Sequence, residues 1–149
     1  MDVSLSDNTN GSNLSELKAE IRSIAEEFGS PALIILDTLA RNFGDGDEND
    51  TRDMTSFIAE VDRLNDEFDC ASLIVHHAGH GEKGRARGSS ALKGALDTEY
   101  KITKTNDQIQ MTNTKMKDEE PPDPMQFYLI PIDIGKDENG DSVSSAVLE

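Results

Sequence analysis

The apolar positions of the first half of the chain predict a helix, a strand, a second helix and a second strand. Apolar residues that recur every three or four positions predict the helices, and short unbroken apolar runs predict the strands. The helical positions are Leu14, Leu17, Ile21, Ile24 and Phe28, then Met54, Phe57, Ile58, Val61, Leu64 and Phe68. The strands are residues 33–36 and 73–75. Because an unbroken apolar run is typical of a strand covered on both faces, we expect a parallel β-α-β unit between helices.

Polar residues follow both predicted strands. Asp37 and Thr38 follow the first strand, and His76 and His77 follow the second. A right-handed crossover brings the carboxyl ends of two parallel strands to one edge, where open α/β sheets bind ligands. Four apolar residues running into Asp37 form the pattern of a Walker B strand, whose aspartate holds a phosphate-bound Mg²⁺ through water. The same pattern also occurs where an aspartate stabilises a turn, so both interpretations of Asp37 stay open.

The second half of the chain predicts antiparallel strands. We expect strands at residues 98–103, 109–114 and 127–134, with a hairpin turn at Asn106-Asp107. A turn signal at Asn139-Gly140 precedes a last short strand at 143–148. The fold class is therefore α/β, with a parallel β-α-β core followed by C-terminal antiparallel strands. We divide the chain into a mobile leader (1–12), one domain (13–135) and a C-terminal tail (136–149).

Composition limits the classes of protein to which the chain can belong. With 149 residues it is long enough for one domain with a sizeable core, but 35% hydrophobic residues and a net charge of −16 predict that part of it is solvated. Its single cysteine, Cys70, excludes an internal disulfide. We find neither an apolar run of about 18 residues nor a signal-peptide pattern. The sequence therefore predicts a cytoplasmic protein without a membrane segment.

Basic residues are concentrated in one part of this acidic chain. Residues 83–117 contain eight lysines and arginines against three acids, a net charge of +5 that leaves −21 for the rest. Lys83, Arg85 and Arg87 lie in a Gly-rich loop of the kind that can follow a phosphate backbone. An ordinary solvated face that balances acidic neighbours explains the charge equally well.

Three histidines close together suggest a second kind of site. His76, His77 and His80 resemble the first histidine cluster of metallo-β-lactamase-like hydrolases. That motif requires H-x-H-x-D-H and further distant histidines, and the chain has three histidines in all. A zinc site requires three or four converging ligands, so a structural role for the pair is the stronger interpretation.

Five short motifs occur in an order that resembles a known family. They are LIILDTLAR (33–41), DENDTRDM (47–54), LIVHH (73–77), RGSSAL (87–92) and TKMKD (114–118). Together they resemble the carboxyl-terminal half of RecA-like ATPases of the RepA-type hexameric helicase group, found in plasmids, phages and bacterial genomes. The resemblance runs from about residue 14 to the end of the chain, and it implies a partial RecA-like P-loop NTPase fold.

The resemblance implies roles for particular residues. Asp37 matches the Walker B aspartate, Thr38 the residue beside it, and His77 the polar residue that senses the γ-phosphate. The loops 41–50 and 79–88 match the two loops that contact single-stranded DNA in the central channel. Lys115 and Lys117 match paired basic residues that reach the nucleotide of a neighbouring subunit, where the family often has arginine at the second position. The implied cofactors are Mg²⁺ and ATP, and the implied assembly is a hexamer.

One departure from the family is larger than these matches. The sequence G-x-x-x-x-G-K-[ST] is absent from the 149 residues, and the family's catalytic glutamate would lie upstream of Met1. We therefore expect a fragment, a split gene product or a degenerate relative that neither binds nucleotide tightly nor hydrolyses ATP alone. The alternative is a non-catalytic DNA-binding or assembly module on the same fold. Without the P-loop strand the sheet should have unpaired edges, so we also expect self-association, most simply as a two-fold dimer.

Overall fold

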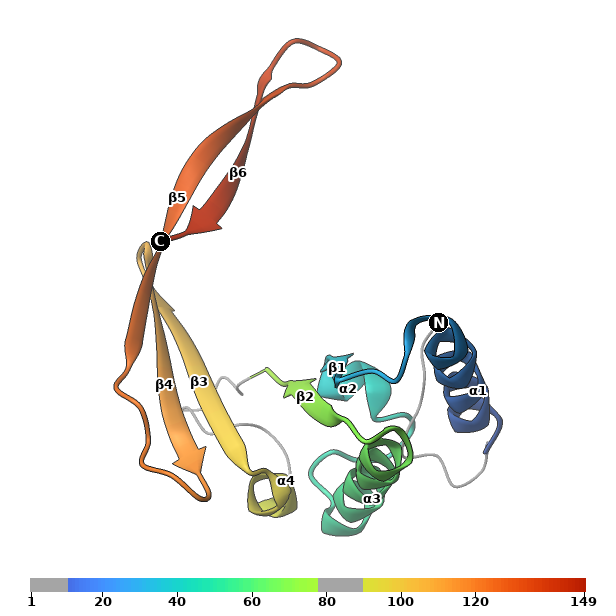
Figure 1. Ribbon diagram of the computed structural model, residues 1–149. Helices are drawn as coiled ribbons and strands as arrows, with labels where there is room; N and C mark the ends of the chain where they lie inside the picture. The colour runs from blue at the N-terminus through green and yellow to red at the C-terminus, as the bar shows by residue number, and fades with distance from the viewer. Residues whose placement is uncertain (1–10, 78–89) are drawn as a thin grey trace. The chain divides into compact units, whose positions relative to one another are not determined.

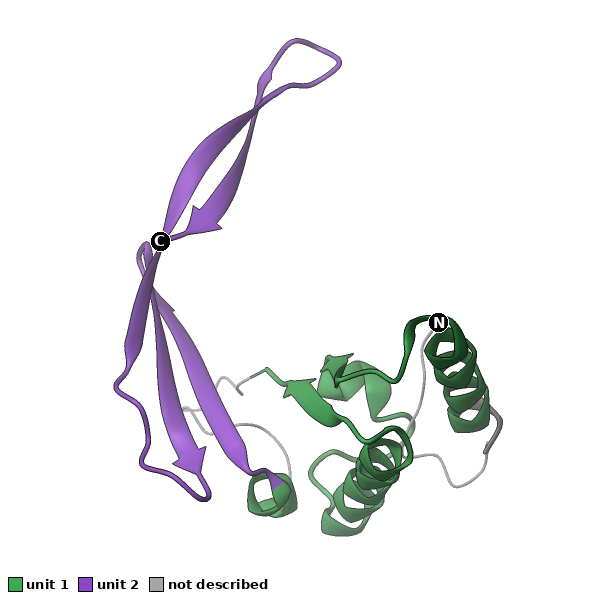
Figure 2. Cartoon of the chain, in the orientation of Figure 1, with its two compact units in different colours: residues 1–95 green, residues 96–149 purple. Residues whose placement is uncertain are grey.

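The structure, a computed structural model, describes residues 11–77 and 90–149 of the chain. The chain forms two compact units, Met1–Ala95 and Leu96–Glu149, which we describe separately (Figures 1 and 2). The predicted domain of residues 13–135 spans the boundary between these units. The first unit contains α1 (Gly11–Phe28), β1 (Leu33–Asp37), α2 (Leu39–Asn42), α3 (Thr51–Phe68), β2 (Ala71–Val75) and α4 (Ser90–Ala95). Residues 1–10, most of the predicted leader, lie outside the described part of the chain.

The first unit contains the predicted parallel β-α-β arrangement. β1 pairs with β2 in parallel, and Leu33 lies beside Ala71 and Asp37 beside Val75. The connection runs through α3, which begins where the Asp50 carboxylate accepts hydrogen bonds from the backbone amides of Arg52 (2.8 Å) and Asp53 (3.0 Å). Both strands and the helix lie within a few residues of their predicted positions.

A stripe along α3 forms most of the hydrophobic core. Its buried side chains recur at helical spacing, as the sequence predicted. The rings of Phe57 and Phe43 are 5.3 Å apart between centroids, which is within the range of a favourable aromatic pair. The buried apolar residues are Leu36, Leu39, Phe43, Met54, Phe57, Val61, Leu64, Phe68 and Leu92.

The expectation that both faces of the parallel strands are covered is wrong for the described residues. Leu36 is buried, but its neighbours on the opposite face of β1, Leu33 and Ile35, are 48% and 58% exposed. Leu73, beside Ile35 in β2, is 49% exposed. Helix α3 packs its apolar stripe against one face of the β1–β2 sheet. The other face is apolar, and none of the described residues covers it.

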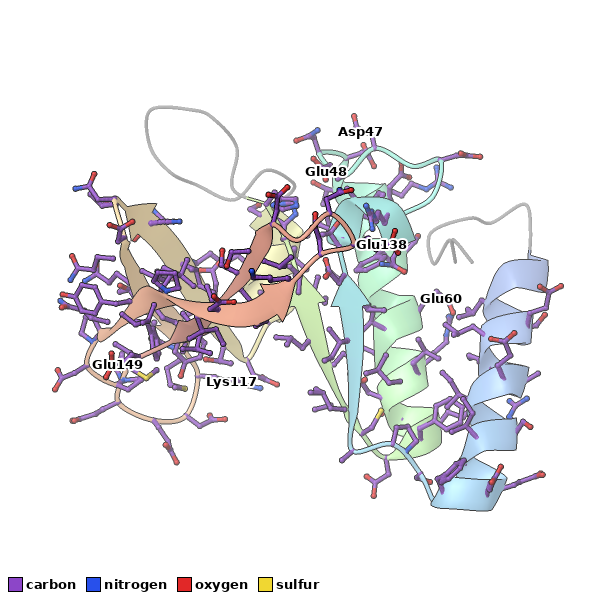
Figure 3. All side chains as sticks on the ribbon, turned by 90° about the horizontal axis from the view of Figure 1, so that it is seen from above. Asp47, Glu48, Glu60, Lys117, Glu138 and Glu149 are labelled. Carbon is purple, nitrogen blue, oxygen red and sulfur yellow. The ribbon has the colours of Figure 1, made fainter. Side chains whose placement is uncertain are left out.

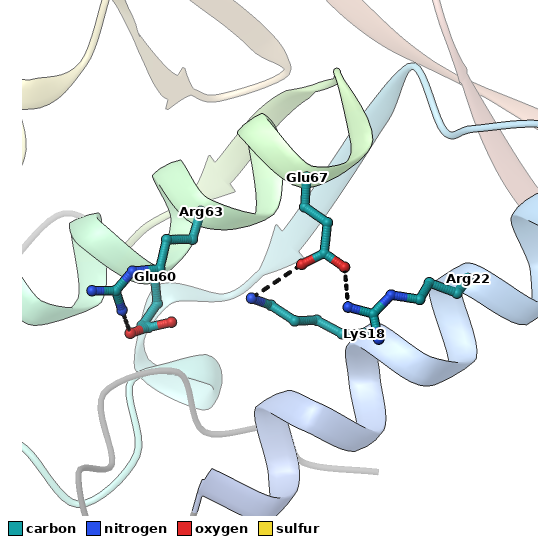
Figure 4. Close-up of polar contacts among 5 residues, drawn as sticks. All are labelled: Lys18, Arg22, Glu60, Arg63 and Glu67. Carbon is teal, nitrogen blue, oxygen red and sulfur yellow. Dashed lines mark hydrogen bonds and ion pairs between the residues drawn. The ribbon is translucent and has the colours of Figure 1, made fainter.

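Helix α1 is attached to α3 through charged side chains (Figure 4). Lys18 Nζ lies 3.3 Å from the Glu67 carboxylate, and Arg22 donates a hydrogen bond to the same group. Partial burial of Glu67 raises the pKa of its carboxyl, but the hydrogen bonds and charges of Arg22 and Lys18 outweigh this effect and lower it. The predicted apolar stripe of α1 is buried only in part, since Ile24 and Phe28 are 59% and 76% exposed.

The second unit is a four-stranded antiparallel sheet in the order β3-β4-β5-β6. Its strands are β3 (Thr98–Thr105), β4 (Gln108–Met116), β5 (Met125–Lys136) and β6 (Ser142–Leu148). Asn106, with φ +55°, forms the β3–β4 turn, and Gly140, with φ +87°, lies in the β5–β6 turn. The predicted antiparallel strands and both turns are confirmed, and no residue of this unit is fully buried.

Candidate nucleotide site

Asp37 ends strand β1 at the carboxyl edge of the parallel sheet. It lies beside Val75, the last residue of β2. Since successive side chains of a strand point to opposite faces, the burial of Leu36 directs Asp37 to the uncovered face. Asp37 is exposed, so its carboxylate is accessible to a hydrated cation or to solvent.

Thr38 connects this edge to the short helix α2. The peptide between Asp37 and Thr38 is cis. The Thr38 carbonyl accepts hydrogen bonds from the backbone amides of Arg41 (3.1 Å) and Asn42 (3.2 Å) and from the Asn42 side chain (2.8 Å). The Thr38 hydroxyl makes no capping bond to α2. Leu39, which is fully buried, anchors the segment in the core, so the polar groups of Asp37 and Thr38 remain at the sheet edge.

The histidine pair follows strand β2 at the same edge. β2 ends at Val75, the partner of Asp37, and His76 and His77 are the next two residues. His76 is partly buried, whereas His77 is exposed. The parallel register thus places Asp37, Thr38 and His77 at the ends of two adjacent strands, as the sequence predicted.

The described residues give no support to the alternative zinc site. Among residues 11–77 and 90–149, no three His, Cys, Asp or Glu side chains gather in a way that would hold a metal ion. The third histidine of the hydrolase-like pattern, His80, lies outside the described residues.

The acidic loop before α3 stabilises the start of that helix. Asp47 accepts hydrogen bonds from the Asn49 amide (2.8 Å) and side chain (2.9 Å), which lower the pKa of the Asp47 carboxyl. The Asp47 amide in turn donates to Asp53 (3.0 Å). Asp47 and Glu48 are labelled in Figure 3. The acids of this loop thus have a structural role at the start of α3.

Lys115 and Lys117 belong to the second unit, in and just after β4. Lys117 Nζ lies 2.9 Å from the Asp97 carboxylate, and both side chains are largely exposed. This hydrogen bond and the charges of Asp97 and Asp118 raise the pKa of Lys117. Lys83, Arg85 and Arg87, the predicted DNA-binding residues, lie outside the described part of the chain.

Two polar contacts of the first unit were not predicted from the sequence, one beside Asp37 and one at the amino end of β2. Asn42 fixes the Thr38 carbonyl, and its position four residues after Thr38 in a short helix is the signal that identifies it. Asn65 joins the end of α3 to β2, because its side-chain oxygen accepts a hydrogen bond from the Ser72 hydroxyl (2.6 Å). No local pattern predicts that second contact, since it spans the turn between a helix and a strand.

Comparison with protein-family models matches residues 1–83 to the AAA domain. A search of curated proteins finds no match. Among the described residues, no helix is long and apolar enough to cross a membrane. The matched range contains both parallel strands and the sheet edge with Asp37, Thr38 and His77. Because this range covers more than half of the 149 residues, the chain belongs to the AAA domain family of ATPases.

Proposed function

We propose that this chain is the Walker B-containing half of a RecA-like helicase ATPase of the RepA type. In the complete ATPase, Asp37 would hold a Mg²⁺ ion through water, Thr38 would lie beside it, and His77 would sense the γ-phosphate. The observation that carries this proposal is the parallel register in which Asp37 lies beside Val75, two residues before His77. Ligands of open α/β sheets bind at the carboxyl ends of such strands.

The remaining roles follow from the resemblance and from charge. Lys115 and Lys117 would reach the nucleotide of a neighbouring subunit in a hexamer. Lys117 is held by Asp97, so it would have to exchange that partner for a phosphate. We assign the contact with single-stranded DNA to Lys83, Arg85 and Arg87 rather than to the loop before α3. Residues 43–50 contain four acids and no base, and would repel a phosphate backbone.

Nucleotide binding by this chain should be weak. The 149 residues contain no P-loop, whose backbone amides and lysine hold the phosphates. We expect no ATP hydrolysis and at best a millimolar affinity, about 4 kcal/mol. ATP turnover that persists through purification and disappears in Asp37→Ala would contradict this expectation.

An amide chemical-shift titration with Mg²⁺-ATP tests the site at such low affinity. Progressive shifts should appear at Asp37, Thr38 and His77, and they should disappear in Asp37→Asn. Asp62→Asn, an exposed position on α3, makes the same change of charge and should leave the shifts intact. Shifts that are unchanged in Asp37→Asn, or that map to other residues, would remove this edge as the nucleotide site.

DNA binding is tested by the anisotropy of a labelled single-stranded oligonucleotide. Simultaneous alanine substitution of Lys83, Arg85 and Arg87 should abolish the binding, whose salt dependence should follow a slope of about −0.7 per phosphate contact. The matched control replaces three exposed lysines of the second unit, Lys101, Lys104 and Lys136, with the same loss of charge. Equal binding by both triple variants would exclude a specific role for the basic loop.

A further inference from the structure

The two edge strands of the second unit differ in charge. β3 carries Glu99, Lys101 and Lys104, whereas β6 (Ser142–Leu148, SVSSAVL) carries neither a charged residue nor a proline. Charged residues and proline are the usual features that prevent an edge strand from pairing with another chain. β6 has no strand on its outer side among the described residues. Of the two edges, β6 is therefore the one that is open to further pairing.

The hydrogen bonds of β6 with β5 show which of its backbone groups point outward. Tyr128 and Glu149 exchange two hydrogen bonds, of 2.7 and 3.0 Å. In an antiparallel pair, hydrogen-bonded and non-hydrogen-bonded positions alternate, so Val147 and Ser145 point their backbone groups toward β5. The residues whose amides and carbonyls point outward are Ser144, Ala146 and Leu148. Pro131 on β5, the partner of Ala146, is consistent with this assignment. A residue at a non-hydrogen-bonded position donates no amide to the facing strand, and proline has no amide hydrogen to donate.

We propose that β6 pairs antiparallel with β6 of a second copy of this chain, about a two-fold axis at Ala146. In this register Ala146 lies opposite Ala146 of the second copy, and Ser144 lies opposite Leu148. All three outward residues of each copy then form hydrogen bonds, six in total by the antiparallel pattern. The two four-stranded sheets become one continuous sheet, and the interface is isologous.

Side chains and charges in this register are compatible with self-pairing. Val147 and Leu148, which are 45% and 60% exposed, lie opposite Ser145 and Ser144 of the second copy, so each large side chain faces a small one. Glu149 lies opposite Val143, and Asp141 extends past the last residue of the facing strand. No like charges are therefore placed directly opposite each other, an arrangement that would destabilise the pair.

The acidity of the unit predicts how association depends on salt. Residues 96–149 contain twelve acids and five lysines, a net charge of −7. Two such units repel each other at low ionic strength, and salt screens that repulsion. The β6 dimer should therefore become more stable as salt increases, opposite to the DNA binding proposed above. It does not depend on the nucleotide site, so Asp37→Ala should dimerise as the wild type does.

Sedimentation equilibrium of the full chain, over a concentration series at moderate salt, tests the proposal. Ala146→Pro removes an outward amide from each copy without removing a bond to β5, and should raise the dimer dissociation constant at least tenfold. Ala146→Lys should act in the same direction, whereas Ile102→Lys adds the same charge to the exposed face of β3 and should have little effect. A chain that stays monomeric at high concentration, or one in which Ile102→Lys disrupts the dimer as strongly, would overturn the proposal.

Amide hydrogen exchange provides a second test that needs no substitution. The outward amides of Ser144, Ala146 and Leu148 should exchange slowly in concentrated protein and quickly after dilution. The inward amides of Ser145 and Val147 should change much less, because their bonds to β5 persist in the monomer. Dilution-independent exchange of the outward amides in a chain that is still dimeric would place the interface elsewhere.

Discussion

The two units of this chain are stabilised in different ways. Among the described residues, all nine buried apolar side chains lie in the first unit, and five of them lie on α3. The described residues of the second unit are partly or fully exposed, and the strands that carry them are joined by backbone hydrogen bonds. A helix concentrates its apolar stripe on one small area, whereas a single sheet has two faces and needs a partner to bury either one.

This difference bears on where the chain interacts with other molecules. The first unit has one uncovered apolar sheet face beside the candidate nucleotide edge, and the second has exposed isoleucines on β5 (Ile130, Ile132 and Ile134). Exposed apolar surface of this kind usually indicates an interface. We therefore expect stability to depend on α3 within one copy and on strand pairing between copies, and the following substitutions test this division.

The largest effect should come from the core of the first unit. Phe57→Ala removes a fully buried ring that packs on Phe43 and should lower the free energy of unfolding by about 3–5 kcal/mol. Ile132→Ala, at a position that is 40% exposed, should cost less than about 1 kcal/mol. Denaturant unfolding followed by circular dichroism measures both. Equal losses would mean that the sheet of the second unit has a buried face in solution.

A smaller effect should come from the start of α3. Asp50→Ala removes the side chain that caps the amides of Arg52 and Asp53, and should cost about 1 kcal/mol. Asp50→Asn keeps an acceptor oxygen and should retain most of the stability. The same unfolding experiment distinguishes them, and an equal loss in both variants would indicate that charge rather than the capping bond is responsible.

The ion pairs that hold α1 should contribute less. Glu67→Gln removes the charge shared by Lys18 and Arg22, and because these groups are partly exposed we expect a small loss of stability that decreases with salt. Glu60→Gln, in a pair confined to α3 itself, is the control. Faster amide exchange in α1 of Glu67→Gln alone would show that the pairs hold this helix against α3.

The smallest effect should be local to the β5–β6 turn. Hydrogen bonds from the amides of Asp141 and Asn139 lower the pKa of the Asp137 carboxyl below its ordinary value of 3.8. The hydrogen bonds to the Asp137 carboxylate therefore stabilise the folded turn above pH 3.8, and this stabilisation is lost as the pH falls through the lower pKa of the folded state. Amide shifts of residues 139–141 should report this transition. In Asp137→Asn it should disappear, while the shifts of α3 stay unchanged.

Much of the fold could be predicted from the sequence, because the signals are local. The spacing of Met54, Phe57, Val61, Leu64 and Phe68 defines the buried stripe of α3, and an apolar run ending at Asp37 defines β1. The edge with Asp37 and His77 also followed from the sequence. A helical crossover makes the strands parallel, and parallel strands bring their carboxyl ends together.

Only the tertiary structure decided which surfaces are covered. The same unbroken apolar run places Leu36 in the core and leaves Ile35 exposed, because among the described residues a helix stripe packs against one face of the sheet and not the other. The attachment of α1 through Glu67 joins residues 45 positions apart, and no local pattern specifies such a contact. Likewise, β6 is an outer strand because no further strand of the described residues pairs with it. This depends on the order of the whole sheet and not on the seven residues of β6.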